Sequence, residues 1–277
     1  MLASLRADLE LLKQAGRAAG ELAMRFFRQN PVVRSKLGGS PVTDADTQVD
    51  ELLRTTLLAA RPHYGWLSEE TADDPAQRSH DTIFVVDPID GTRGFIDGDD
   101  RWCVSLALVR GGRPVVAVLN APARGESFTA IAGEGAWNGA SRLSVSAASD
   151  LAGARLAGPR GWLKTDAIAT VQAALEAHVP SLAYRFAMVA AGRLDAAFAS
   201  PRANDWDLAA ADLLVHEAGG RLTDLEGGIP RYNREVPRHH ALAAANAVLH
   251  PALLAIVRAA EQEVARSRPA PRLGKRE

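Results

Sequence analysis

Residues 83–92 read Ile-Phe-Val-Val-Asp-Pro-Ile-Asp-Gly-Thr, the most informative segment of the chain. Its apolar start, rich in β-branched residues, predicts a short buried strand. Pro88 has no amide hydrogen for a central ladder, so we expect the chain to turn out of the sheet at Asp87 and Asp90. The segment therefore predicts two carboxylates close together at the end of a buried strand.

These residue types in this order point to metal and phosphate binding. Carboxylates on such a turn bind divalent cations through oxygen, and the carbonyl of Ile89 between them can be a further ligand. Gly91 permits close approach of the backbone, and a helix that opens after Thr92 would direct free N–H groups at an anion. Metal carboxylates beside a phosphate cradle are typical of metal-assisted phosphate chemistry. The same residues also form ordinary turns, so the segment alone leaves a plain loop open.

The composition is that of an ordinary globular protein. The 277 residues are 47% hydrophobic and 23% charged, with a net charge of −1. This balance excludes bulk electrostatic binding to nucleic acid or to a membrane surface. We expect no membrane span, because no apolar run reaches roughly 18 residues, and no signal peptide, because the N-terminus lacks an unbroken apolar region.

The cysteine and histidine content excludes a disulfide framework and a zinc site. The single cysteine, Cys103, lies in an apolar run and predicts a small buried side chain in a reducing, cytoplasmic compartment. No histidine has zinc-ligand spacing to a second ligand, and His239 and His240 predict a solvated loop pair.

The first half of the chain predicts two helices followed by a β-rich block. Apolar residues at steps of three and four predict a long helix from Leu2 that ends before Pro31, and a second helix from Thr43 or Asp44 to Pro62. The β-rich pattern predicts strands near 65–67, 102–109, 114–120 and 127–132.

The second half predicts helices alternating with short strands. Helices are expected near 164–177, 182–191, 206–218 and 249–265, and strands near 154–157, 195–199 and 241–245. We predict two subdomains, residues 1–148 and 149–265. The basic, proline-containing residues 266–277 predict a disordered tail. Helices feeding an antiparallel sheet give an α+β class.

Three further acidic positions occur at predicted element ends. Glu69 and Glu70 follow the strand before Asp87, and Asp46 lies early in the second helix. Asp207 lies in the first turn of the helix over 206–218, for which Asp205 is the predicted N-cap. Each position also has an ordinary explanation, as a solvated loop or as a favourable charge near a helix N-terminus.

Together these motifs resemble the inositol monophosphatase family of magnesium-dependent, lithium-sensitive phosphatases. The resemblance spans roughly residues 5–262. It is carried by the segments Asp87-Pro88-Ile89-Asp90-Gly91-Thr92, Trp206-Asp207-Leu208-Ala209-Ala210-Ala211, Glu217-Ala218-Gly219-Gly220, Ser68-Glu69-Glu70 and Val42-Thr43-Asp44-Ala45-Asp46. It implies an α+β fold, a layered αβαβα sandwich of the inositol monophosphatase and fructose-1,6-bisphosphatase type, with the active site between two subdomains.

The resemblance also implies a set of metal ligands. Glu69, Asp87 and the Ile89 carbonyl would bind one Mg²⁺, and Asp87, Asp90 and Asp207 would bind a second. Glu69 would also help to hold a third, more weakly bound ion.

The water and the phosphate have their own implied partners. Thr92 and Asp46, assisted by Glu69, would align and deprotonate the attacking water. The N–H groups of Gly91 and Thr92 would hold phosphate oxygens, and Asp90 and Asp207 would also face the substrate.

The substrate is less well defined by the sequence. Inositol monophosphatases commonly place a glutamate seven residues before the aspartate of the W-D motif, where this chain has Ser200. Residues 90–96 and 102–109 look more like bacterial 3'(2'),5'-bisphosphate nucleotidases, which remove the 3'-phosphate of 3'-phosphoadenosine 5'-phosphate.

A second phosphate on the substrate needs cations. Arg93, Arg185 and Arg202 are candidates, because a guanidinium can bind phosphate through two hydrogen bonds. Lys36 lies on a loop near the expected site and could offset negative charge. An ordinary surface role remains open for each of them.

We therefore predict a Mg²⁺-dependent phosphomonoesterase acting on 3'-phosphoadenosine 5'-phosphate. Inositol phosphate and histidinol phosphate remain alternatives, since the segment over 90–96 also occurs in histidinol-phosphate phosphatases. A non-catalytic metal- or nucleotide-binding regulator is the different-class alternative, but it would not need Thr92 and Asp46 together. The expected partner is a small phosphorylated substrate. The sequence does not define the oligomeric state. The assembly that we consider is a homodimer.

Overall fold

The computed structural model describes residues 2–36 and 39–267. The helices are α1 (Leu2–Met24), α2 (Asp44–Ala60), α3 (Pro75–Arg78), α4 (Thr92–Ile96), η1 (a 3₁₀ turn, Pro122–Arg124), α5 (Asp166–Ala169), α6 (Leu182–Ala190), α7 (Asp205–Glu217) and α8 (His250–Ser267).

The strands form three sheets. A small hairpin pairs β1 (Val33–Ser35) with β2 (Pro41–Thr43). The large sheet contains, in spatial order, β3 (Gly65–Ser68), β4 (Thr82–Asp90), β5 (Cys103–Arg110), β6 (Arg113–Ala121), β7 (Glu126–Ile131), β8 (Gly135–Asn138) and β9 (Ser141–Arg142). The second sheet contains β11 (Ala174–Leu175), β10 (Arg155–Ala157), β12 (Ala196–Ala199), β14 (Leu242–Asn246) and β13 (Gly220–Asp224).

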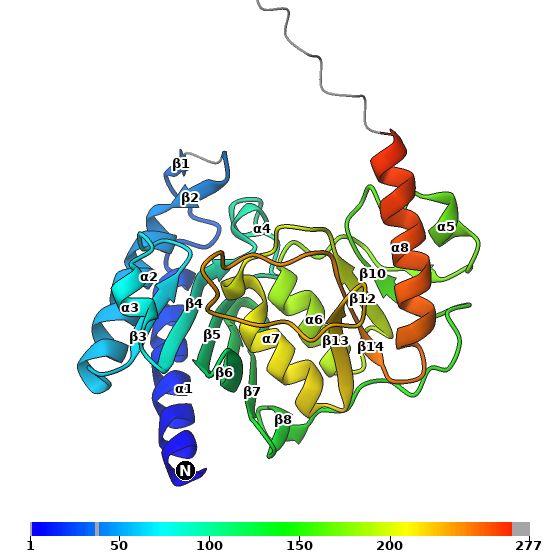
Figure 1. Cartoon of the computed structure of the whole chain (residues 1–277). Coiled ribbons are helices and arrows are strands. Elements are labelled where there is room, and N and C mark those ends of the chain that lie inside the picture. The colour runs from blue at the N-terminus through cyan, green and yellow to red at the C-terminus, as the bar shows by residue number, and fades with distance from the viewer. Residues whose placement is uncertain (1, 37–38, 268–277) are drawn as a thin grey trace, which may run out of the picture.

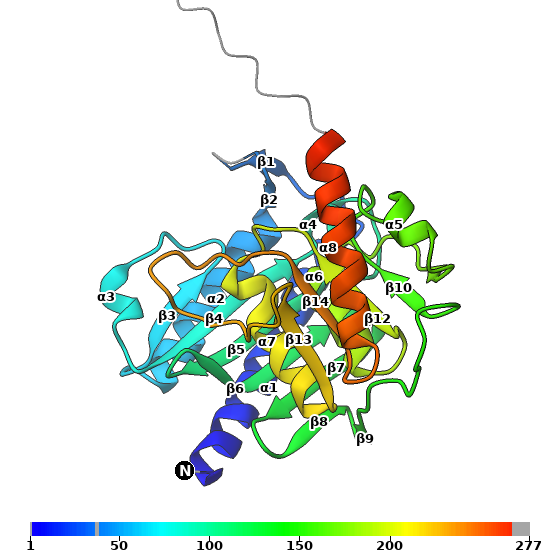
Figure 2. The ribbon, with the colours of Figure 1, turned by 45° about the vertical axis from the view of Figure 1, so that its right-hand side comes forward.

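Helices and sheets alternate in five layers (Figure 1 and Figure 2). Helices α1 and α2 cover one face of the large sheet, α6 and α7 lie between the two larger sheets, and α5 and α8 cover the outer face of the second sheet. Each interface has its own cluster of buried apolar side chains. The predicted α+β layered αβαβα sandwich is confirmed.

Strand β4 is an inner strand of the large sheet, next to the edge strand β3. Its side chains alternate between two cores: Ile83 and Val85 face α6 and α7, whereas Phe84 and Val86 pack with α1 and α2. A strand covered on both faces requires a continuous apolar run, and residues 83–86 supply it.

The prediction that the chain leaves the sheet at Pro88 was wrong. Asp87 pairs with Ser105 and Asp90 pairs with Cys103, so β4 carries one extra residue between these pairs. Such a bulge accommodates the missing amide hydrogen of Pro88 without ending the strand. It brings Asp87 and Asp90 to the last residues of a strand that stays paired on both sides of the bulge.

Three differences concern the second half of the chain. The helix expected over 164–177 ends at Ala169, and Gln172 then takes a left-handed φ of 51° before β11 joins the edge of the second sheet. Strand β13 was not predicted, because its glycine-rich start reads as a helix end. Helix α8 extends to Ser267, so the predicted tail begins too early, and its residues 268–277 lie outside the described residues.

The predicted subdomain boundary at residue 148 lies between β9 of the large sheet and β10 of the second sheet. The division into 1–148 and 149–265 stays a prediction. Among the described residues, none of the helices is long and apolar enough to cross a membrane. Cys103 is fully buried, as predicted.

Candidate active site

Three acidic side chains from distant parts of the chain meet beside the end of β4. Glu69 directly follows β3, Asp87 lies in β4, and Asp207 lies in the first turn of α7. One carboxylate oxygen from each lies within 4.8 Å of the others. The sequence analysis had predicted all three as metal ligands.

The cluster has the properties of a cation site. Asp87 is 1% exposed, and its Oδ2 atom is buried without a hydrogen-bond partner among residues 2–36 and 39–267. An orphaned buried carboxylate oxygen is costly unless it is paired, and oxygen ligands suit hard divalent cations. The residues present therefore fit a divalent metal ion.

Burial and mutual repulsion act together on these acids. Burial raises the pKa of Asp87 well above its ordinary value, and the charges of Glu69 and Asp90 raise it further. Burial also raises the pKa of Asp207, with Asp90 and Glu69 as the next causes. Such a cluster repels itself unless positive charge is bound among its members.

Asp90 is held from the opposite side by helix α6. Its Oδ2 accepts a hydrogen bond from the Ser181 hydroxyl and another from the backbone N–H of Ala183, at 2.6 Å. Burial raises the pKa of Asp90 to about 6, although the bond from Ser181 opposes this change. The charge of Asp90 raises the pKa of both Asp87 and Asp207, but Asp90 lies outside the three-carboxylate group. Its predicted ligand role stays a prediction.

Lys36 contacts the edge of the acidic cluster. Its ammonium group lies 2.7 Å from Oε1 of Glu69 and 2.7 Å from Oε1 of Glu70. Burial raises the pKa of Glu70 to about 7 even with this partner. The lysine thus lies near the site, as expected, and contacts acidic side chains there.

Thr92 and Asp46 lie together, although they are far apart in sequence. The Thr92 hydroxyl is 3.2 Å from Oδ1 of Asp46 and 3.1 Å from the Ile89 carbonyl oxygen. One hydroxyl has one proton, so it donates to one of these acceptors at a time. Burial raises the pKa of the Asp46 carboxyl group.

Gly91 has a conformation that fits few other residues. Its φ is 94°, and an added Cβ would lie 3.0 Å from the backbone nitrogen of Ser181. It directly precedes Thr92, where α4 begins as expected. The turn therefore requires glycine both for its backbone conformation and for the close approach of α6.

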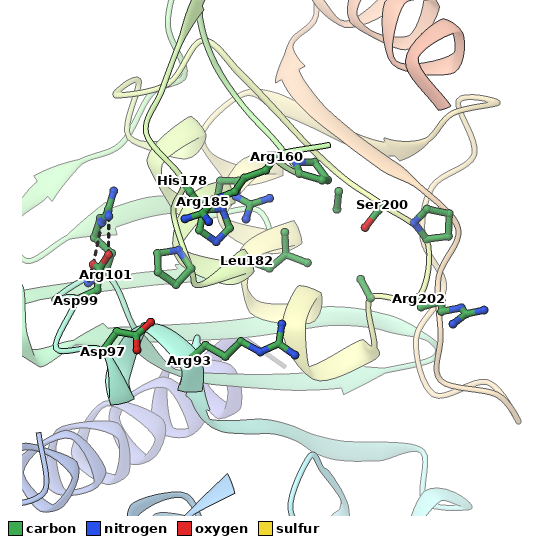
Figure 3. A pocket seen from close by; sticks show the side chains of 16 residues that line it. Arg93, Asp97, Asp99, Arg101, Arg160, His178, Leu182, Arg185, Ser200 and Arg202 are labelled. Carbon is green, nitrogen blue, oxygen red and sulfur yellow. Dashed lines mark hydrogen bonds and ion pairs between the residues drawn. The ribbon is translucent and has the colours of Figure 1, made fainter. Parts of the chain in front are cut away.

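A cavity of about 690 Å³ opens between α4 and α6, where Arg93 and Leu182 line it (Figure 3). None of the three clustered acids lines this cavity. Two lining residues are next in the chain to groups near the acids: Arg93 follows Thr92, and Leu182 lies between the two residues that bond to Asp90. All three arginines predicted for the substrate line this cavity: Arg93, Arg185 and Arg202.

Further charged side chains line the same cavity. Arg101 and Arg160 add positive charge, and Asp97 and Asp99 add negative charge. Arg101 forms an ion pair with Asp99, and its Nε lies 2.9 Å from Oδ1 of that residue. Ser200 is also in the lining, where the resemblance would place a glutamate in inositol enzymes. The cavity is therefore cationic on balance.

The sequence analysis missed a buried acid–histidine pair beside Asp207. His239 is 8% exposed rather than solvated, and its Nε2 lies 2.7 Å from Oδ1 of Asp205. Asp205 is therefore not the N-cap of α7. That position belongs to Asn204, whose N–H donates to Oδ2 of Asp207 at 2.6 Å. The spacing of Asn204 and Asp207, an N-cap and the third helical residue, was the available signal.

The same pair fixes the segment that carries Arg202. The Arg202 N–H donates to the His239 carbonyl, and the His239 N–H donates to the Ala203 carbonyl, at 2.9 and 2.8 Å. Arg202 itself has a left-handed φ of 87°. The segment over residues 237–239 thus holds one wall of the cavity against the start of α7.

The chain thus combines a five-layer αβαβα sandwich with three carboxylates that converge beside the inner strand β4, an arrangement suited to metal-assisted phosphate chemistry. Comparison with family models agrees: residues 5–262 match the inositol monophosphatase family, and the chain belongs to that family. The family is metal-dependent, and the chain is a phosphatase of the inositol monophosphatase type.

Individual relatives cover nearly the whole chain. The histidinol-phosphatase of Mycobacterium tuberculosis is 36% identical, over 89% of this chain and 96% of its own length. The inositol-1-monophosphatase of Mesorhizobium japonicum is 33% identical, over 90% of this chain and 96% of its own length. The crystal structure of the extragenic suppressor protein SuhB from Bartonella henselae superposes with a TM-score of 0.80 at 31% identity, covering 91% of this chain and 98% of that one.

Proposed function

We propose that the protein is a Mg²⁺-dependent phosphomonoesterase that converts 3'-phosphoadenosine 5'-phosphate to AMP and phosphate. The observation that carries the proposal is the convergence of Glu69, Asp87 and Asp207, together with a cationic cavity that Arg93, the residue after Thr92, lines. The acids suit a metal-assisted reaction at one phosphate, and the arginines suit a substrate that carries a second one.

Glu69, Asp87 and Asp207 would hold two Mg²⁺ ions, together with Asp90 and the Ile89 carbonyl, and Glu69 would help to hold a weaker third. Bound there, Mg²⁺ supplies positive charge that activates water and neutralises the leaving oxygen. The orphaned Oδ2 of Asp87 supports this assignment.

The protein groups would position the water and take its proton. Thr92 donates to or accepts from the water, and Asp46 receives the proton through the contact that it makes with the Thr92 hydroxyl. The water oxygen bonds to phosphorus while the bond from phosphorus to the 3'-oxygen breaks. The N–H groups of Gly91 and Thr92 bind phosphate oxygens and need no rearrangement, because Gly91 already has its left-handed conformation.

The charge of the cavity supports a bisphosphate over a neutral polyol. Arg93, Arg160 and Arg202 line it together with the buried Arg185, and Ser200 offers no carboxylate for sugar hydroxyls. Lys36 would offset negative charge beside Glu69. Direct contacts of Lys36, Arg93, Arg185 and Arg202 with the substrate are part of this proposal.

Histidinol phosphate is the second candidate substrate. The 36% identity to the mycobacterial histidinol-phosphatase favours it, and Asp97 in the cavity could pair with its ammonium group. Arginine outnumbers acid around the cavity, however, so we rank this cationic compound below the bisphosphate. The predicted cytoplasmic location and the homodimer stay predictions.

Phosphate release from a panel of substrates tests the proposal. The panel contains 3'-phosphoadenosine 5'-phosphate, histidinol phosphate and inositol 1-phosphate, each with Mg²⁺ and with Mg²⁺ plus Li⁺, and an Asp207→Asn variant serves as the matched inactive control. We expect the highest kcat/KM for the bisphosphate and inhibition by Li⁺. A higher kcat/KM for either other compound would overturn the substrate assignment, and release from none would favour a non-catalytic regulator.

A further inference from the structure

Arg185 is a buried cation without a counter-ion at ion-pair distance. It lies on α6, is 6% exposed and lines the cavity. Within residues 2–36 and 39–267, no carboxylate oxygen approaches its guanidinium to 4.0 Å. Its bonds are to the backbone carbonyls of Val179, at 2.7 Å, and Phe198, at 3.3 Å, and its Nε is buried without a partner.

Neighbouring groups add positive charge and a second orphaned atom. The Nδ1 atom of His178 is buried without a partner in the described part of the chain. Burial lowers the pKa of His178, and the charges of Arg185 and Arg160 lower it further, although the charge of Asp99 opposes this change. Figure 3 shows these side chains gathered on one side of the cavity, across from Arg93.

This arrangement is unfavourable unless an anion binds to it. A buried guanidinium costs several kcal/mol when it is not fully paired. Burial accordingly lowers the pKa of Arg185 to about 10, although the charge of Asp90 opposes this change. A charged group with a perturbed pKa that lines a cavity is a candidate for a binding site, and an anionic ligand would complete the pairing here.

We propose that Arg185, with Arg160 and His178, binds an anionic phosphate group on the leaving side of the substrate. This inference rests on the proposed function and deepens it, because it names the residues that distinguish a bisphosphate from a monophosphate. The ligand class is a phosphate monoester attached to the group that departs with the leaving oxygen.

The position of Arg185 along α6 fits this role. Ser181 caps α6 and donates to Asp90, whereas Arg185 lies four residues further on, about one turn or ~6 Å along the axis. One helix therefore connects a predicted metal ligand with the arginine. A sugar ring that carries two phosphates would span the distance between the reacting phosphate and this second site.

Thermal melting of variants separates a ligand-binding arginine from a structural one. Arg185→Met keeps the apolar length and removes the charge. If the role is ligand binding, its Tm without ligand equals or exceeds that of the wild type, because an uncompensated charge has been removed. A clearly lower Tm would mean that Arg185 stabilises the fold through its hydrogen bonds to Val179 and Phe198, and would overturn the proposal.

Arg193→Met is the matched control. Arg193 is partly buried and follows the same helix, but it is paired with Glu126 at 2.7 Å and does not line the cavity. We expect this variant to have a lower Tm than the wild type and to show the same increase in Tm when AMP binds.

Comparing AMP with adenosine isolates the phosphate group. In the Mg²⁺-loaded wild type, AMP should raise the Tm more than adenosine does, and this difference should vanish in Arg185→Met. In the same variant, KM for 3'-phosphoadenosine 5'-phosphate should rise about 10- to 100-fold, as for the loss of a charged hydrogen-bonding partner. The Arg193→Met control should keep the kcat for p-nitrophenyl phosphate, which has one phosphate, within about twofold of the wild type.

The outcomes distinguish the two proposals. If the bisphosphate is hydrolysed with an unchanged KM in Arg185→Met, the function stands and the assignment of Arg185 fails. If the bisphosphate is not hydrolysed but the AMP effect still depends on Arg185, the anion site stands and the substrate assignment fails.

Discussion

The Thr92 hydroxyl lies 3.2 Å from Oδ1 of Asp46, and the other oxygen of that carboxylate is already committed. Asp46 Oδ2 accepts from the N–H of Thr43, at 2.7 Å, and from its hydroxyl, at 2.6 Å, which forms the capping box of α2. The cap therefore fixes the orientation of the carboxylate and leaves Oδ1 facing Thr92. A helix-capping function and a candidate catalytic function share one side chain.

Replacing the Thr92 hydroxyl should impair turnover without unfolding the protein. Thr92→Val keeps the shape and removes the group that would hold the water, so we expect kcat to fall about 10²- to 10⁴-fold. Thr92→Ser is the control and should retain most of the activity. A Thr92→Val enzyme with at least half of the wild-type kcat would show that the hydroxyl does not position the water.

Asp90→Asn tests the predicted metal ligand. The amide oxygen can still accept from Ala183, so the fold should survive, while one negative charge is lost next to the metal site. We expect kcat/KM to fall by roughly 10²- to 10³-fold, corresponding to several kcal/mol of lost charge stabilisation. Normal activity with an unchanged Mg²⁺ requirement would contradict the ligand assignment.

Removing metal should lower stability, because the clustered carboxylates then repel one another. At a Mg²⁺ concentration 100 times its Kd, binding contributes about 2.7 kcal/mol. For a chain of this size that difference corresponds to roughly 5–10 °C in Tm. Melting curves with Mg²⁺ and with excess chelator measure it, and Asp87→Asn should reduce the difference. Equal Tm values in both conditions would argue against a metal site here.

The pair formed by His239 and Asp205 should support Mg²⁺ binding from a distance. His239→Ala leaves the Asp205 carboxylate buried with one partner fewer and loosens the start of α7, where Asp207 lies. We expect the Mg²⁺ concentration for half-maximal activity to rise about tenfold, the lower end of the effect of outer partners of metal ligands.

Two variants serve as controls for His239. His239→Gln can replace the Nε2 contact and should restore Mg²⁺ dependence. His250→Gln alters another buried histidine, which contacts Thr223 at 3.1 Å in the second sheet, and should lower Tm without changing the Mg²⁺ requirement. An equal Mg²⁺ shift in His250→Gln would assign the effect to general destabilisation.

The stability contributed by Asp195 should depend on pH. The Arg155 guanidinium bonds to Asp195 and lowers the pKa of that carboxyl to about 2. A lowered pKa means that the stabilisation is fully present above the ordinary value near 4 and is lost as the pH falls towards 2. Because Arg155 is 46% exposed, we expect Asp195→Asn to cost only about 1 kcal/mol at pH 7.

Urea unfolding of the wild type and Asp195→Asn at pH 7 and pH 3 measures this effect. The difference in unfolding free energy should shrink by about half at pH 3, where part of the stabilisation is already lost. The same difference at both pH values would indicate that the ion pair does not lower the pKa of Asp195.

The sequence predicted the elements whose patterns are local. Continuous burial of residues 83–86 and the three- and four-residue steps of α1 and α2 reflect packing on fixed faces, and these elements formed where expected. The converging acids were predicted from the combined motifs and the family resemblance that they carry, since each position alone also has an ordinary explanation. A local sequence pattern does not show which helices and strands bring their acidic residues together in the fold.

The features that were missed depend on contacts between distant segments. His239 reads as a solvated loop residue until Asp205 is placed next to it, and Gln172 breaks a helical pattern only because its carbonyl bonds to Gly153 at the sheet edge. Pro88 was expected to end its strand, but pairing with β5 continues across a bulge, and the pairing with β3 has already ended at Val86. Tertiary pairing outweighed local propensity at each of these positions.

Strand β4 contributes side chains to two apolar cores, and this determines how the protein responds to an empty metal site. Neither core can open near Asp87 without exposing side chains of the other. Repulsion among the acids therefore cannot be relieved by local fraying of the strand, and it lowers the stability of the whole molecule instead. The backbone amides of residues 83–86 should thus exchange with solvent only through global unfolding, with or without bound cations.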